Sequence, residues 1–573
     1  MNTGEVDPPV SYDVPRELLD AATSLPGALE ALVEAYPAFE CLIFLDRHWN
    51  EERVTVEQFW RRVGDVQAEL LRRGLKPGHS VVIILPTCFD LAAAYFGVIM
   101  AGGTPALEAS PSNRFADMGI YTRLLGEILG NADGQFLLTD DAIADLFEGE
   151  AAEHLGDASL MRPADIPHVG EPPQPRAFAP ADIATIQYSS GSTGTPKGVL
   201  LSHRAMLNNI RDVRDGLDLK PQDVSVNWIP LYHDMGLIDA FLLPLLCGCP
   251  TVLIPTMDFM ADPGLWLKGV HRYRGALSWA PNFAYTLCSR RISDKQLAGL
   301  DLSSWRIAIN AAEPVLAKTI TTFTERFAPY GFAPEAMTPA WGLAENVTIA
   351  TAHPIDEVPL VETIDRDVLG AENRAVPTDG DGLASVAIGK CLPRCAVEIR
   401  NEQGDVLGDR EVGVVWLGTD SLFDAYKNNP ELSAKLLVDG WLDTGDRGYM
   451  LDGHLFFVSR GKDIIIIGAE KYAPHDIETV INRVPGVREG CAVAFGVMSE
   501  ARGTEDLGAV IETRTEGEEA LDELARNIRS EVMHVTGLAV RHLKLVPPGG
   551  IHKTTSGKLA RRATRERYAH EFA

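Results

Sequence analysis

The 573-residue sequence is poor in the features of a disulfide scaffold, a zinc protein or a membrane protein. It has only eight cysteines, and its close pairs, Cys247 with Cys249 and Cys391 with Cys395, have no histidine partners at the spacing of a zinc site. We therefore expect reduced thiols that serve in packing. The most apolar stretch, residues 241–255, contains prolines and a glycine and is too short to span a bilayer as a helix, so no membrane span is expected.

Positive charge is also scarce. The chain has 52 Lys and Arg against 80 Asp and Glu, which gives a formal net charge of −28. A surface this acidic repels a phosphate backbone, so nucleic acid is not an expected partner. The first residues lack the basic start and apolar run of a signal peptide, which predicts a cytoplasmic protein.

What the sequence does contain is alternation. A helical pattern at 56–75 is followed by an apolar run at 81–85 and a helix-like segment at 90–103, and the same rhythm recurs at 223–255 and 266–287. Such alternation predicts a layered α/β architecture. The length exceeds what one core supports, so two or more domains are expected.

The texture changes after about residue 355. Short apolar runs separated by Gly and Asp turns predict a β-rich region, and residues 461–573 again mix strands with helices, which predicts a small separate C-terminal domain. The polar stretch 365–381 is expected to be a surface insertion without a role in the core. The basic run 558–568 is most simply a solvated terminal helix.

The most specific segment is YSSGSTGTPKGVLLSH, residues 188–203. Glycines let backbone N–H groups approach an anion, hydroxyls donate hydrogen bonds, and Lys197 adds a compact positive charge, so this loop is suited to phosphate. It is not a Walker loop, because Pro196 precedes the lysine and Gly198 follows it. The alternative interpretation is a flexible surface linker.

Four further motifs follow in the order WGLAEN (341–346), WLDTGD (441–446), SRGKD (459–463) and KTTSGK (553–558). With the loop at 188–203 they resemble the adenylate-forming superfamily of acyl-CoA ligases, fatty acyl-AMP ligases and luciferases, over nearly the whole chain. PLYHDMGLI, PNFAYTLCSRRI, AAEPV and DRDVLGAENRAV look most like fatty acyl-AMP ligases. The resemblance implies α/β subdomains and a β-rich subdomain in residues 1–460, followed by a mobile α+β domain at 461–573.

The resemblance also implies a reaction. An apolar carboxylic acid would be activated with ATP and Mg²⁺ as an acyl adenylate, then passed to the thiol of CoA or of phosphopantetheine on an acyl carrier protein. Bringing two anions together while pyrophosphate leaves requires positive charge and a metal ion near the phosphates. Alternatives are an enzyme of one half-reaction, such as thioesterification of a supplied acyl adenylate, a non-catalytic acyl or nucleotide sensor, and a luciferase-like enzyme that uses oxygen.

The family pattern assigns roles to single residues. Lys558 is the expected catalytic residue, with its ammonium between the acyl carboxylate and the α-phosphate. Glu345 is the candidate metal ligand, and Trp341 would flank adenine. Asp446 can accept both ribose hydroxyls, with Arg460 at the same sugar. Taken singly, these residues are more typical of a terminal lysine, a solvated acid, a core tryptophan, a turn residue and a surface cation.

The full expected site has two parts. The acyl pocket would include His233 and Asp234, which need not transfer protons because the attacking carboxylate is already ionised; a histidine satisfied by its neighbours is the alternative. Asn282 and Phe283 complete that pocket. The expected nucleotide contacts are Ser189, Ser190, Gly191, Ser192, Thr193, Gly194, Lys197, Ala312, Glu313, Trp341, Gly342, Asp446 and Arg460.

The sequence departs from the family pattern in places. Trp341 is bulkier than the Tyr or Phe of relatives, Ala469 occupies the place of a usual glycine in the loop expected to line the thiol path, and His552 replaces a frequent proline. Lys462 matches the position at which relatives place the hinge of their C-terminal domain. The expected rotation would bring Lys558 and the thiol loop to one site in turn.

Overall fold

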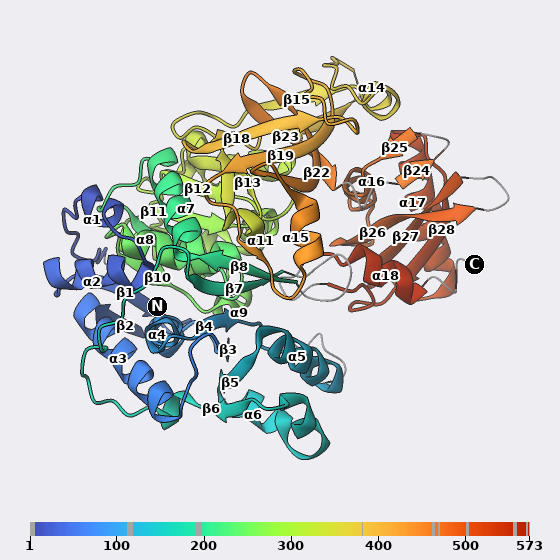
Figure 1. Cartoon of the computed structure of the whole chain (residues 1–573). Helices are drawn as coiled ribbons and strands as arrows, with labels where there is room; N and C mark the ends of the chain where they lie inside the picture. The colour runs from blue at the N-terminus through green and yellow to red at the C-terminus, as the bar shows by residue number, and fades with distance from the viewer. Residues whose placement is uncertain are drawn as a thin grey trace.

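The computed structural model describes residues 6–111, 118–189, 197–380, 382–460, 465–467, 470–499, 504–553, 558–568 and 571. Layered α/β units occupy the first part of the chain, a β-rich unit follows, and a smaller α+β unit lies at the C-terminal side (Figure 1). The expected fold class is confirmed.

A mostly parallel sheet forms the centre of the large part. Among the described residues its strands follow the order β17-β14-β13-β12-β11-β9-β10-β1-β2, with β2, β14 and β17 antiparallel to their neighbours. Every position of β11 and β12 is buried, as expected for parallel strands covered on both faces. The bounds are Glu40–Leu45 (β1), Glu51–Thr55 (β2), Val224–Asn227 (β9), Thr251–Leu253 (β10), Gly275–Ala280 (β11), Ile307–Asn310 (β12), Met337–Gly342 (β13), Ile349–Ala352 (β14) and Lys390–Cys391 (β17).

Two smaller sheets lie beside the central one. A parallel sheet has the order β4-β3-β5-β6, and an antiparallel sheet has the order β20-β8-β7. The second sheet carries Lys197 at the start of β8 and joins residues far apart in the chain, since Tyr426 of β20 pairs with Val199. The bounds are Ser80–Ile84 (β3), Thr104–Leu107 (β4), Gly134–Thr139 (β5), Ser159–Met161 (β6), Ile183–Ser189 (β7), Lys197–Ser202 (β8) and Ala425–Tyr426 (β20).

The helices of the large part lie near the positions that the sequence predicts. The segment expected at 56–75 is α3 (Val56–Arg72), which begins at a capping box of Thr55 and Gln58. It packs on α4 (Phe89–Ala101), which ends at Gly102 with a φ of 87°. Other helices are Arg16–Asp20 (α1), Leu25–Ala35 (α2), Met118–Ala132 (α5), His203–Gly216 (α7), Leu243–Leu246 (α8), Gly264–Tyr273 (α10), Asn282–Arg291 (α11), Ala317–Phe327 (α13) and the π-helix Met235–Leu242 (η4).

The β-rich region after residue 355 is also present. An antiparallel sheet has the order β18-β19-β22-β21, with β23 paired to β22, and β15 pairs with β16 beside it. The stretch 365–381 corrects one expectation, because it forms a short helix and places Ala375 in a small buried cluster. The bounds are Val361–Ile364 (β15), Arg366–Glu372 (α14), Leu383–Val386 (β16), Cys395–Arg400 (β18), Gly413–Thr419 (β19), Pro430–Leu436 (α15), Leu437–Val438 (β21), Trp441–Leu451 (β22) and His454–Arg460 (β23).

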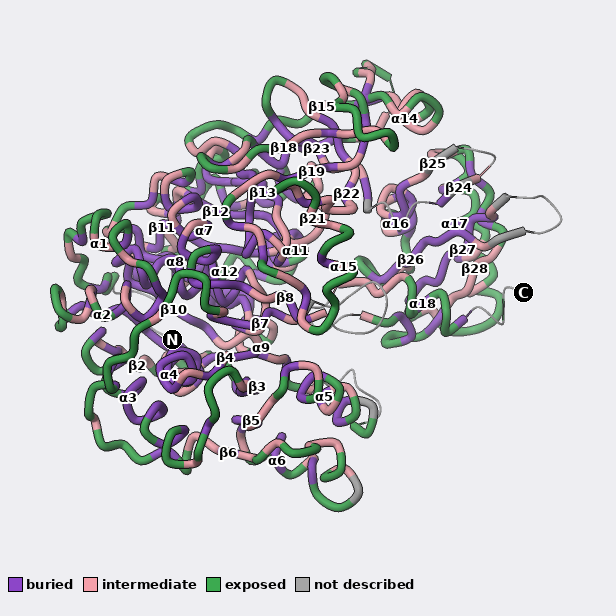
Figure 2. The backbone as a smooth tube through the Cα atoms, in the orientation of Figure 1, coloured by how far each residue is buried: buried purple, intermediate pink, exposed green. Residues whose placement is uncertain are grey.

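The C-terminal part has its own apolar cluster, centred on Ile477, Ile481, Ile511 and Ile528. Figure 2 shows buried residues along β26 and β27, apart from the buried centre around α8 and β10. The basic terminal helix is not fully solvated, because Thr564 and Tyr568 are buried. The bounds are Ile465–Ile467 (β24), Glu470–Tyr472 (β25), Pro474–Ile481 (α16), Val487–Ser499 (β26), Thr504–Thr513 (β27), Glu518–Thr536 (α17), Val540–Val546 (β28) and Arg561–Tyr568 (α18).

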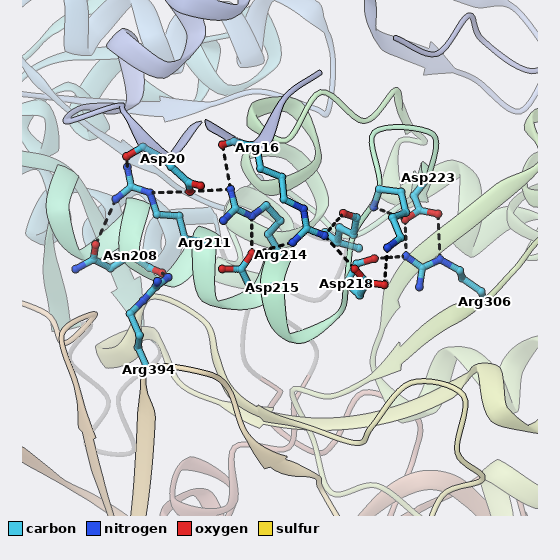
Figure 3. Close-up of polar contacts among 12 residues, drawn as sticks. Arg16, Asp20, Asn208, Arg211, Arg214, Asp215, Asp218, Asp223, Arg306 and Arg394 are labelled. Carbon is cyan, nitrogen blue, oxygen red and sulfur yellow. Dashed lines mark hydrogen bonds and ion pairs between the residues drawn. The ribbon is translucent and has the colours of Figure 1, made fainter. Parts of the chain in front are cut away.

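An ion-pair network fixes α7 to distant parts of the chain (Figure 3). Arg214 of α7 pairs with Asp20 at 2.8 Å, which ties the N-terminal segment to this helix. On the other side of α7, Asp212 pairs with Arg394 at 2.9 Å. We call the ion pairs on and beside α7 the α7 network; its members are Arg16, Asp20, Arg211, Asp212, Arg214, Asp215, Asp218, Lys220, Asp223, Arg306 and Arg394.

Two findings concern the cysteines and the apolar helices. All eight cysteines are free, and Cys247 and Cys249 are buried in packing positions. Within the part of the chain that the structure describes, no helix combines the length and the apolar character needed to cross a bilayer.

Candidate nucleotide and acyl site

Several of the expected site residues lie at or after the carboxyl ends of parallel strands. His233 follows β9, Asn282 follows β11, Glu313 follows β12, and Trp341 is the last residue but one of β13. Because β9, β11, β12 and β13 run parallel, their carboxyl ends meet at one edge of the sheet. This edge is the usual ligand position in α/β sheets.

Trp341 and Asp446 meet directly. The Trp341 indole Nε1–H donates to Asp446 Oδ2 at 2.9 Å, and the two residues are 7% and 3% exposed. Asp446 lies where extra residues of β22 oppose β19, next to Gly445 with a φ of 69°, so a bulge aims its carboxylate toward β13. Two residues expected to contact the nucleotide therefore also contact each other.

Glu345 and Lys197 meet through Tyr426. The Tyr426 hydroxyl donates to Glu345 Oε1 at 2.5 Å, and Lys197 Nζ lies 5.3 Å from the centre of the Tyr426 ring. Burial is the largest cause of a raised pKa for Tyr426, and the charge of Glu345 adds to it, so the hydroxyl keeps its proton and donates. Tyr426 is not among the site residues expected from the sequence.

The expected catalytic lysine lies close enough to two acids of the large part to affect their ionisation. Burial alone would raise the pKa of Asp234, but the charge and hydrogen bond of His233, whose Nδ1 lies 2.6 Å from Asp234 Oδ1, and the charge of Lys558 lower it to about 2. Burial raises the pKa of Glu313, against the opposing charges of Lys558 and Lys553. The C-terminal part thus brings a positive charge to this edge of the sheet.

The loop after β12 is held by residues expected in the acyl pocket. Glu313 Oε1 accepts from the Phe283 N–H at 2.6 Å, and Asn282 Oδ1 accepts from the Leu316 N–H at 3.1 Å. Ala312 has a φ of 70°, a left-handed conformation that is strained for a residue with a Cβ. Asn282 is buried and braces this loop, and its expected contact with an acyl chain stays a prediction.

The remaining expected residues divide into described and undescribed positions. Gly342 allows the tight return from β13 to β14, because a Cβ there would lie 2.1 Å from the Thr348 carbonyl oxygen. The backbone of Ser189 pairs with Lys197, and that of Arg460 pairs with Asp446. The side chains of Ser189 and Arg460 lie outside the described residues, as do Ser190, Gly191, Ser192, Thr193, Gly194, Lys462, Gly468 and Ala469.

The residues at the candidate site are suited to binding Mg²⁺ that is already coordinated by the phosphates of ATP. Within the described ranges, no group of three His, Cys, Asp or Glu could hold a metal ion by itself. Glu345 is half-buried and offers one carboxylate. Mg²⁺ is commonly bound by one or two carboxylates together with substrate phosphates, so a single acid suffices when ATP supplies the other ligands.

Comparison with known proteins agrees with this geometry. The model of the AMP-binding enzyme family matches residues 29–427. A putative acyl-CoA synthetase of Caulobacter vibrioides is 32% identical over 505 residues, covering 87% of each chain. The chain belongs to the AMP-binding enzyme family, and the resemblance to adenylate-forming enzymes is confirmed.

Fatty acyl-AMP ligases are among the relatives. The long-chain-fatty-acid–AMP ligase FadD26 of Mycobacterium marinum is 32% identical over 578 residues, covering 95% of this chain and 97% of that protein. A structure from a study of fatty acyl-adenylate ligases of E. coli and L. pneumophila aligns with a TM-score of 0.88 at 32% identity, covering 96% of this chain and 98% of that one. A ligase of L. pneumophila in complex with acyl adenylate and pyrophosphate aligns with a TM-score of 0.75 at 26% identity, covering 97% and 98%.

Proposed function

We propose that this protein joins an apolar carboxylic acid to AMP, using ATP, and then passes the acyl group to a thiol. In the first step a carboxylate oxygen of the acid bonds to the α-phosphorus of ATP, and the bond from that phosphorus to pyrophosphate breaks. In the second step a thiol attacks the acyl carbonyl, and AMP leaves. The relatives named as fatty acid–AMP ligases support this assignment.

The proposal draws its main structural support from the charge of Lys558. Its charge acts on Asp234 and Glu313, although it lies more than 200 residues after both in the chain. A positive charge at this place can stabilise the negative charge that develops as the acid and the α-phosphate meet.

The other residues take roles around this centre. Asp446, oriented by Trp341, would accept the ribose hydroxyls, with Arg460 at the same sugar, and Lys197 would contact phosphate. Glu345 would hold Mg²⁺, which when bound supplies positive charge to the phosphates of ATP. His233 and Asp234 would border the acid with Phe283.

We also propose the division into residues 1–460 and 461–573. The separate apolar cluster of the C-terminal part supports it. Among the described residues, the contacts between the parts include polar ones, since Arg290 pairs with Glu489 and Arg366 donates to the Val535 carbonyl at 2.5 Å, and a ring contact between Phe457 and His475. Such contacts can exchange, so the C-terminal part could turn and give a thiol access to the acyl carbonyl.

The test uses purified full-length protein with ATP, Mg²⁺ and a panel of carboxylic acids of increasing chain length. Acyl adenylates are detected by mass spectrometry and pyrophosphate by a coupled assay, then CoA or a phosphopantetheine-bearing carrier protein is added. We expect adenylate with apolar acids and thioester with one acceptor. Nucleotide binding without any adenylate would contradict the proposal and favour a sensor, whereas thioester formed only from supplied adenylate would favour an enzyme of one half-reaction.

A further inference from the structure

The segment 423–427 joins the two phosphate-side elements of the candidate site. Its Phe423 N–H donates to the Glu345 carbonyl at 2.8 Å, and its Lys427 N–H donates to the Gly198 carbonyl at 2.7 Å. Strand β20 within it pairs with β8, which begins at Lys197. The segment therefore contacts the loop of the expected metal ligand and the strand of the expected phosphate lysine at the same time.

Tyr426 is the side chain at the centre of this junction. It is 4% exposed, its backbone N–H donates to Ser433 Oγ at 2.8 Å, and its ring packs against Phe423 at 4.8 Å between centroids. These contacts fix the ring. With the ring fixed, the hydroxyl is aimed at Glu345 Oε1 and the ring face at Lys197 Nζ.

The kind of donor matters for a metal ligand. A hydrogen bond to an ionised carboxylate is strong and restricts its orientation. An arginine in the same place would add a positive charge and repel a divalent cation, whereas the phenol is neutral and leaves the negative charge of Glu345 intact. The ring face also attracts the Lys197 ammonium without neutralising it.

We propose that Tyr426 is a positioning residue that orients Glu345 toward the divalent cation of the ATP complex and holds Lys197 beside the phosphates. The inference rests on the proposed function, because that function supplies the roles of Glu345 and Lys197. Tyr426 does not touch the reacting atoms. Its contribution is the fixed geometry of two charged groups, one at the start of β8 and the other in the turn between β13 and β14.

The test is Tyr426→Phe, which removes the hydroxyl and keeps the ring. We use Mn²⁺ as the probe and follow it by electron paramagnetic resonance, with and without ATP. We expect Y426F to bind Mn²⁺ with ATP about tenfold more weakly than the parent. Binding of metal-free ATP, measured by calorimetry with a chelator present, should change less than about twofold, because the ring and its Lys197 contact remain.

Tyr449→Phe is the matched control. Tyr449 is also buried and donates to a glutamate, Glu362 Oε1, at the same 2.5 Å, but it lies in the β-rich region. Y449F should lower thermal stability and leave Mn²⁺ binding at the parental value. Unchanged Mn²⁺ binding in Y426F, or an equal loss of Mn²⁺ and of metal-free ATP binding, would overturn the proposal.

A double variant covers the possibility that an unpartnered carboxylate disturbs the fold of Y426F. Glu345→Gln removes the charge that the hydroxyl orients, so adding Y426F to E345Q should cost no further Mn²⁺ affinity. A further tenfold loss in the double variant would place the effect of Tyr426 elsewhere. These binding measurements need neither a carboxylic acid nor turnover. Their outcome is therefore independent of whether the parent protein forms an acyl adenylate.

Discussion

The α7 network and the candidate site hold their carboxylates in different ways. In the network, acids pair with arginines, as in Asp20 with Arg214 and Asp223 with Arg306. In the site, the described hydrogen bonds that orient Asp446 and Glu345 come from an indole and a phenol. An arginine fixes a carboxylate and cancels its charge, whereas a neutral donor fixes it and leaves the charge for a ligand.

The two regions also differ in where their positive charges come from. The arginines of the α7 network belong to the part of the chain that they stabilise. The cation that acts on Asp234 and Glu313 is Lys558, which belongs to the C-terminal part. Under the proposed function the site binds two anions, and the proposed rotation of the C-terminal part would carry this cation away before the product is released.

The largest expected effect comes from removing the positive charge of Lys558. Lys558→Ala should slow adenylate formation about 10²- to 10³-fold, because it removes charge stabilisation from the transition state. ATP affinity and folding should change little. Pyrophosphate release in single turnover measures the effect.

The control for Lys558→Ala is Lys544→Ala. Lys544 is on β28 of the same C-terminal part and pairs with Glu571. The two variants lose the same charge, so only a position-specific role separates them. Equal rates in K558A and the parent would remove Lys558 from the adenylation step.

The next effect tests whether the indole of Trp341 orients Asp446. Asp446→Ala should weaken ATP and acyl adenylate alike, by about tenfold to a hundredfold, because the ribose contact is made in both complexes. Trp341→Phe keeps an aromatic ring and loses the N–H, so about a tenfold loss is expected. In the Asp446→Ala background, Trp341→Phe should cost almost nothing further.

Calorimetry on the four proteins completes this cycle. Trp416→Phe is the control, because Trp416 packs under Arg400 at 4.5 Å in the β-rich sheet and its loss should leave nucleotide affinity unchanged. Additive losses at Trp341 and Asp446 would contradict the orienting role and leave Trp341 as a ring that only stacks on adenine.

Local structure could be predicted from the sequence where it depends on local periodicity. The helix expected at 56–75 is α3, and the apolar run at 81–85 is β3, because helix and strand periods are visible within a few residues. The prediction that the stretch 365–381 has no role in the core was wrong. Ala375 packs in a cluster with residues such as Tyr449 and Phe456, and its N–H donates to the Arg410 carbonyl; no local pattern encodes these distant contacts.

The composition of the candidate site follows from sequence motifs and stays a prediction, whereas its internal contacts are seen only in the structure. Lys558, Trp341, Asp446 and Glu345 were found by motif, and the structure describes each of them. The bond between Trp341 and Asp446 spans 105 residues, and the bond between Tyr426 and Glu345 spans 81. Hydrogen bonds at such separations follow from strand order and bulges, so only the fold reveals them.

The smallest expected effect concerns the α7 network and its pH dependence. The Asp212 side chain is fully buried on α7, while its partner Arg394 is 40% exposed. Burial raises the pKa of Asp212, and the charge of Arg394 only partly opposes this, so the pKa reaches about 6. The ion pair with Arg394 therefore offsets only part of the rise in the pKa of Asp212 that burial causes.

The sign of the effect follows from proton binding. The folded protein holds a proton on Asp212 over a range in which the unfolded chain, with an ordinary carboxyl, has lost it. Between about pH 4 and pH 6 the folded state binds more protons, so Asp212 lowers the free energy of unfolding as pH rises. Asp212→Asn cannot ionise and should remove this slope while its amide oxygen still accepts from the Arg394 N–H.

Denaturant unfolding at several pH values measures the difference between the two proteins. The gap in free energy of unfolding should move in favour of Asp212→Asn from pH 4 to pH 6, by at most about 2 kcal/mol, and then stay constant. Taking the difference cancels the other titrating groups, which both proteins share. If the unfolding free energies of the two proteins ran parallel across this pH range, Arg394 would fully offset the effect of burial on the pKa of Asp212. Arginine partners and neutral donors would then differ only in the negative charge that they leave on the carboxylate for a ligand.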